Sequence, residues 1–143
     1  MEGKTIQAEP SQVWRNGKTF VVLSAHAFIV WLACGLTIAL GRGALGMETT
    51  LWIHAIAAPA FAAIVSFVYF EHFRFTTPLA TAAFFTLFIV ALDALFVAPI
   101  LERSYAMFAS PLGIWLPLLS IFAATWLTGV SIRHPRRQIL SPH

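Results

Sequence analysis

Three ionisable side chains lie inside long apolar stretches of the sequence, namely His26, His54 and Asp93. Placing a charged side chain in a bilayer costs about 3 kcal/mol on insertion scales, so such residues usually face protein or water. Asp93 is the only Asp, Glu, Lys or Arg within these stretches. The low dielectric disfavours its charged form. Three roles stay open for it: moving protons or cations, hydrogen bonding that fastens helices together, and catalysis or ligand binding.

The depth of Asp93 identifies possible partners. It lies eight residues before Leu101, where its apolar run ends, which places it about 12 Å deep in a straight helix. Trp31 and Ser120 fall at the same level of two other runs. An indole N–H and a hydroxyl can both donate to a carboxyl group. We therefore expect Trp31 and Ser120 to be hydrogen-bond donors to Asp93.

The two histidines lie in opposite halves of the expected membrane region. His54 is three residues into its run, about 5 Å below the surface nearer Asp93, so it either binds water and backbone or relays protons with Asp93. His26 lies in the other half, where Thr86 and Thr125 can bond its ring. Two axial haem ligands must meet one iron at one height, which these histidines cannot do.

No other motif in the sequence points to cofactor or metal chemistry. The sequence has no phosphate-binding glycine loop, no pair of zinc ligands at helical spacing and no nucleophile elbow. We therefore predict no cofactor, no metal and no catalytic residue.

The segment from Glu102 to Ser110 mixes Glu102, Arg103 and Tyr105 with apolar residues. It can anchor the chain in the headgroup region or cap a cavity. Three prolines, Pro59, Pro99 and Pro117, lie in the same half of their runs, and each can kink its helix. Their shared level predicts either a cavity above Asp93 or simple bending for packing.

Four apolar runs must position these residues. Apolar residues make up 59% of the chain and charged residues 10%, whereas soluble domains have about 45–50% and about 25%. A helix crosses a bilayer in about 20 residues, and the runs cover residues 20–40, 51–70, 79–101 and 112–132. The sequence therefore predicts an all-α integral membrane protein, with residues 1–143 forming a single four-span domain. Short connectors predict an up-down-up-down four-helix bundle in which consecutive helices are antiparallel neighbours.

The connectors contain residues that end and begin helices. Gly41 and Gly43 follow the first run, where a left-handed C-terminal cap favours glycine. Capping hydroxyls precede the other three helices, at Thr49 or Thr50, at Thr77-Pro78 and at Ser110-Pro111.

The basic residues predict an orientation. One side of the membrane receives Lys4, Arg15, Lys18, Arg74, Arg133, Arg136 and Arg137, and the other receives Arg42 and Arg103. Seven against two places both termini in the cytoplasm. The same flanking pattern argues against a nucleic-acid interface. The brevity of the chain suits a bacterial inner membrane.

Three functions stay open for such a protein. The first is a small transporter or channel-like protein that uses Asp93, His54, Ser120 and Trp31, with Glu102, Arg103 and Tyr105 in the connector beside them. A single four-helix bundle is small for a pore, so this function predicts a homo-oligomer or a larger membrane complex. The second is a non-catalytic accessory subunit of a membrane complex, and the third is an intramembrane enzyme or lipid-binding protein.

Overall fold

The computed structural model describes residues 10–133, with side chains described for residues 15–132. The helices are α1 (Pro10–Ala44), α2 (Met47–His72), α3 (Pro78–Leu92), η1 (Asp93–Glu102), η2 (Ala106–Ala109), η3 (Pro111–Trp115) and α4 (Leu116–Arg133). Four segments of this part of the chain are long and apolar enough to cross a membrane: Arg15–Ala44, Met47–His72, Pro78–Glu102 and Pro111–Ile132. Each contains one of the four expected spans, so the all-α, four-span architecture is confirmed by helix length and composition.

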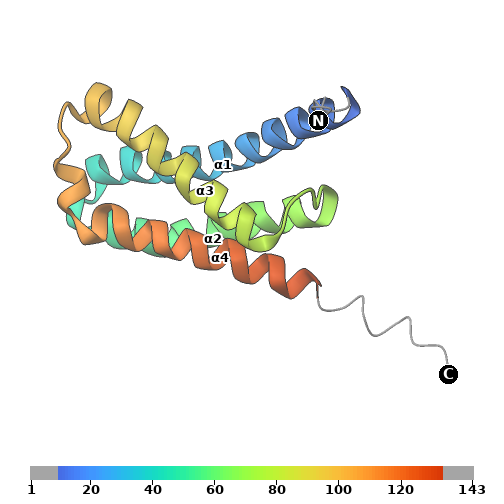
Figure 1. The fold of residues 1–143 in the computed structure, drawn as a ribbon. Helices are drawn as coiled ribbons and strands as arrows, with labels where there is room; N and C mark the ends of the chain where they lie inside the picture. Colours follow the sequence, from blue (N-terminus) through green and yellow to red (C-terminus); the bar gives the residue numbers. More distant parts are fainter. Residues whose placement is uncertain (1–9, 134–143) are drawn as a thin grey trace.

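The four long helices pack as a bundle in which successive helices run in opposite directions (Figure 1). One end carries two connectors, Leu45-Gly46 and residues 103–110, and is called the double-connector end below. The other end carries the described chain ends and the short α2–α3 connector, residues 73–77, and is called the terminal end.

The order of neighbours around the bundle differs from the expected one. α1 packs on α2, α2 on α4, α4 on α3, and α3 on α1, so that α2 and α3 lie diagonally opposite with little contact. The expectation that all consecutive helices are neighbours is therefore wrong for α2 and α3. Gly129 of α4 marks a close approach in this arrangement, because a β-carbon there would lie 2.6 Å from the ring of Phe70 and 2.7 Å from Pro78. The missing side chain lets α4 pack closely against the end of α2 and the start of α3.

The half of the bundle nearer the terminal end is tightly packed. Tyr69 and Phe85 are almost fully buried there. The Ser66 hydroxyl donates to the Thr125 hydroxyl at 3.1 Å and joins α2 to α4. Buried polar side chains in this half therefore act as cross-links between helices.

His26 belongs to this packed half. Its Nδ1 lies 2.8 Å from the carbonyl oxygen of Val22, and its ring meets the rings of Tyr69 and Phe73 edge-on, at 5.5 and 5.4 Å. The expectation that Thr86 and Thr125 would bond it is wrong. The Thr86 hydroxyl donates to the Ala82 carbonyl, and the Thr125 hydroxyl accepts from Ser66. His26 is thus a packing residue whose ring bonds within its own helix.

Two of the expected helix starts are confirmed. The Thr77 hydroxyl accepts from the Ala80 N–H at 3.2 Å, and the Ser110 hydroxyl accepts from the Gly113 N–H at 3.0 Å. In both cases a proline occupies the first helical position, where its missing N–H is not needed.

The connection between α1 and α2 is tighter than expected. α1 continues through Gly41 and Gly43 to Ala44, and the left-handed residue is Gly46, with φ 80°. α2 begins at Met47 without a side-chain cap, and the Thr50 hydroxyl donates to the Gly46 carbonyl. The expected stop at Gly41 and Gly43 and the expected cap at Thr49 or Thr50 are therefore wrong. Gly41 serves packing instead, because a β-carbon there would lie 2.6 Å from Thr50 Cγ2.

Candidate functional site

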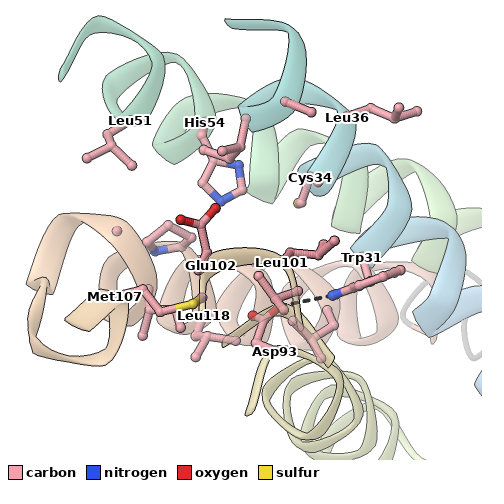
Figure 2. A pocket seen from close by; sticks show the side chains of 18 of the residues that line it. Trp31, Cys34, Leu36, Leu51, His54, Asp93, Leu101, Glu102, Met107 and Leu118 are labelled. Atoms are coloured by element: carbon pink, nitrogen blue, oxygen red, sulfur yellow. Dashed lines mark hydrogen bonds between the residues drawn. The ribbon is translucent and has the colours of Figure 1, made fainter. Parts of the chain in front are cut away.

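A cavity of about 520 Å³ lies among the helices in the half of the bundle nearer the double-connector end (Figure 2). Most of its wall is apolar, and half of the lining residues are aliphatic. The aliphatic residues that line it are Leu32, Leu36, Ile38, Ala39, Leu51, Ile89, Val97, Leu101, Ile114, Leu118 and Ile121. This hollow half contrasts with the packed half beyond it.

Asp93 lies in the cavity wall, at the point where α3 passes into η1. Its Oδ1 accepts a hydrogen bond of 2.9 Å from the indole Nε1 of Trp31 on α1, drawn as a dashed line in Figure 2. The contact expected between these two residues from their depth is thus present. Ser120 is not a partner of Asp93, because its hydroxyl donates to the Pro117 carbonyl of its own helix at 2.8 Å.

The backbone widens where Asp93 stands. η1 has the wide turn of a π-helix, and at its end the N–H of Arg103 donates to the carbonyl of Ala98, five residues earlier. Pro99 lies inside η1 and has no N–H, and its ring would clash with the carbonyl four residues before it in an ordinary helix. The wider turn removes that clash, and π-helical turns of this kind are frequent at functional sites. η3, at the start of the fourth span, has the same geometry.

His54 points from α2 into the cavity (Figure 2). The residue is only 7% exposed, yet its Nδ1 is buried without a hydrogen-bond partner. The ring nitrogens of His26 and His72 behave differently, since each bonds the carbonyl four residues earlier in its helix. No hydrogen bond joins His54 to Asp93 among the described residues, so a relay between them stays a prediction.

An ion pair closes the double-connector side of the cavity. Arg42 at the end of α1 and Glu102 at the end of η1 lie 2.8 Å apart, and both line the cavity. Their side chains are 47% and 39% exposed. Met107 of η2 adds a further lining residue from the connector.

The other connector residues expected at the site, Arg103 and Tyr105, do not line the cavity. Arg103 ends η1 in a left-handed conformation, with φ 50°. The Tyr105 hydroxyl donates to the Ala94 carbonyl at 3.2 Å, and its ring stacks on Phe108. Both residues therefore shape the connector that carries Glu102 and Met107.

The gap between α1 and η1 is closed by few direct contacts, whereas α1 packs on α2 and α2 packs on both α4 and η3. Lining residues on both sides of this gap, Leu36 on α1 and Leu101 on η1, are also exposed on the outer surface. Trp31–Asp93 and Arg42–Glu102 are the two polar contacts that span the gap.

Sequence reasoning missed Arg42, Cys34 and Met107 as lining residues. A signal for Arg42 was present, because it follows Trp31 by eleven residues, about three helical turns, and so lies on the same face of α1. Met107 carried no such signal, because its position depends on the path of the connector.

Comparison with protein-family models, with curated proteins and with solved structures finds no match for this chain. The function is therefore argued from the site itself.

Proposed function

We propose that this small four-span membrane protein binds a small, predominantly apolar molecule within the bilayer and acts as a carrier for it. The observation that carries the proposal is the apolar cavity with the Asp93 carboxyl group in its wall. Ligand sites in proteins are mostly apolar, with a few polar groups that orient the ligand, and this cavity has that composition. The sparse contact between α1 and η1 offers a lateral path by which a lipophilic molecule can enter from the bilayer.

A carrier is favoured over an ion channel. An apolar wall offers few groups that replace the water around an inorganic ion, and apolar constrictions exclude water. Beyond Ile121 the bundle is filled by Tyr69 and Phe85, and the Ser66–Thr125 hydrogen bond crosses it. The cavity therefore does not continue through the bundle in this conformation. A carrier is expected to hold its ligand in such a closed-ended site before it releases the ligand.

The two other functions have less support. An accessory subunit is expected to present small residues to its partner, but the small residues Ala58, Ala62 and Ser66 of α2 are buried inside the bundle. An enzyme is expected to place a nucleophile beside a base, and the described residues form no hydrogen-bonded pair of that kind around the cavity.

The charge distribution supports an orientation for the carrier. We propose that both termini lie in the cytoplasm, because the order of the spans along the sequence assigns seven Lys and Arg residues to the side of the termini and two to the other side. The cavity then lies in the outer half of the membrane. A bacterial inner membrane, and a homo-oligomer or larger complex, remain part of the proposal.

Photolabelling tests the proposed function. The protein in lipid nanodiscs is irradiated with azioctanol, a diazirine alcohol with a mostly apolar body, and the labelled residues are mapped by mass spectrometry. We expect labelling of Met107 and Leu118 in the cavity, in addition to lipid-facing Ile56 and Leu87. Labelling confined to lipid-facing residues would contradict the proposal.

Two variants fill the cavity from facing walls. Gly35→Leu adds a side chain on α1 where a β-carbon meets nothing within 4 Å, and Val97→Phe enlarges a lining residue on η1. Both should suppress labelling of Leu118 while leaving that of Ile56 unchanged. Gly43→Leu is the matched control, because Gly43 has open space around it and does not line the cavity.

A further inference from the structure

We infer that the molecule bound in the cavity is an organic cation, an ammonium group attached to an apolar body, with its positive charge held by Asp93 and the ring of Trp31. The inference rests on the proposed function and specifies the class of ligand.

The charges around the cavity are not balanced. Arg42 and Glu102 form an ion pair with each other at the double-connector end and neutralise one another. Asp93 has no basic partner of this kind, and its hydrogen-bonding partner, Trp31, is neutral. Among the described residues, Cys34 and His54 are the other ionisable side chains in the wall, and neither forms a hydrogen bond or ion pair with Asp93. A carboxylate in an apolar site is stabilised most by an opposite charge, so a cation is the complementary ligand.

The contact with Trp31 prepares Asp93 for such a ligand. The indole N–H holds Oδ1 at 2.9 Å and leaves Oδ2 without a hydrogen bond among the described residues. The Trp31 ring itself lines the cavity, and the rings of Phe28 and Phe96 lie 5.4 and 6.1 Å from it. An ammonium group is attracted both by a carboxylate and by the face of an indole ring. Both residues line the cavity, and the N–H edge of the indole contacts the carboxyl group.

His54 is a second unusual group in this wall. Its side chain is more than nine-tenths buried and its imidazole ring lines the cavity. Its Nδ1 is enclosed by protein without a hydrogen-bond partner, which is uncommon in folded proteins. The ring therefore gives the cavity a polar wall that faces the one containing Asp93.

The size and composition of the wall exclude a bare metal ion as the preferred ligand. A volume of about 520 Å³ lined mainly by apolar side chains is much larger than an ion needs, and the described residues contain no group of three metal-ligating side chains. The apolar volume instead matches the body of an organic molecule, and the single acid matches one positive charge.

Two isosteric compounds test the inference by competing with azioctanol for the cavity. Benzyltrimethylammonium carries a positive charge, and neopentylbenzene replaces its nitrogen by carbon with the same shape. We expect the cation to suppress labelling of Leu118 at concentrations about tenfold lower than the neutral compound, as befits a desolvated ion pair. Asp93→Asn should abolish this difference, and Asp93→Glu should retain it.

The controls separate this inference from the proposed function. Glu71→Gln removes an acid at the terminal end, outside the cavity, and should leave the preference for the cation unchanged. Azioctanol labelling of Leu118 in Asp93→Asn verifies that the variant is folded with an intact cavity. Equal competition by both compounds, with cavity labelling intact, would overturn the inference while leaving the proposed function in place. Absence of azioctanol labelling at Leu118 in the unaltered protein would overturn both the inference and the proposed function.

Discussion

The hydrogen bond between Trp31 and Asp93 joins α1 to the beginning of η1 across the gap between these helices. We predict that Trp31→Phe and Asp93→Asn each lower the free energy of unfolding, and that a double-mutant cycle gives a coupling of about 0.5–2 kcal/mol, the range found for side-chain hydrogen bonds in membranes. The measurement is reversible unfolding in detergent or nanodiscs. Trp126→Phe is the control, because Trp126 is exposed on α4. Additive effects of the two changes would show that the bond contributes nothing.

A second prediction concerns the unpartnered histidine. A buried polar atom without a hydrogen bond costs about 1–3 kcal/mol, so His54→Leu should raise the stability of the ligand-free protein by about 1 kcal/mol. His26→Leu should lower it, because the ring of His26 bonds the Val22 carbonyl and packs between two aromatic rings. Thermal unfolding of both variants in the same detergent provides the measurement. A loss of stability in His54→Leu as large as that in His26→Leu would mean that His54 is a packing residue.

Depth along straight helices predicted which residues share a level, but not which of them meet. Trp31 reaches Asp93 because α1 and α3 are neighbours, and an indole is long enough to span the gap between them. Ser120 lies at the same level, yet its short side chain bonds the Pro117 carbonyl one turn earlier. Serine and threonine in helices commonly satisfy themselves in this local way, and the sequence gives no sign of the choice.

Close contacts at glycine determine how the elements meet. Gly41 of α1 lies against Thr50 of α2, where a β-carbon would approach Thr50 Cγ2 to 2.6 Å. We predict that Gly41→Ala costs about 1–3 kcal/mol of stability, as overpacking usually does. Gly43→Ala is the matched control on the same helix, because a β-carbon there meets nothing within 4 Å. Because alanine favours helix more than glycine, Gly43→Ala should be neutral or slightly stabilising. Equal effects of the two substitutions in a denaturation experiment would contradict the close approach.

The lengths of the four apolar runs in the sequence predicted the four long helices, but they did not predict the order of the helices around the bundle. α4 packs on both α2 and α3, and its Gly129 fits against Phe70 and Pro78, a contact between distant parts of the chain. The π-helical turns of η1 and η3 were likewise not expected, since a proline in an apolar run predicts a kink without specifying its form. Pro59 illustrates this, because α2 continues through it as an ordinary helix.

The molecule as a whole divides into a packed half and a hollow half. The packed half holds the bundle together through buried aromatic residues and the Ser66–Thr125 bond. The hollow half keeps an unpartnered histidine and a lone acid, features that lower stability and are tolerated where they serve binding. Assembly with further copies or with a larger complex stays a prediction. Only 22%, 22%, 17% and 33% of the residues in the four span windows are buried inside the bundle, so most of the surface of the spans is free for lipid or another subunit.

Orientation decides from which side of the membrane the hollow half is reached. The order of the spans along the sequence assigns seven Lys and Arg residues to the side of the termini and two to the other side, so we predict that both termini are cytoplasmic. The test uses single cysteines in a Cys34→Ala background, introduced as Ser104→Cys in one connector and Phe75→Cys in the α2–α3 connector, both at exposed positions. A membrane-impermeant maleimide applied to intact cells should label Ser104→Cys at once and Phe75→Cys only after the membrane is permeabilised. The reverse pattern would place the cavity in the cytoplasmic half, and equal labelling of both would indicate that the chain inserts in two orientations.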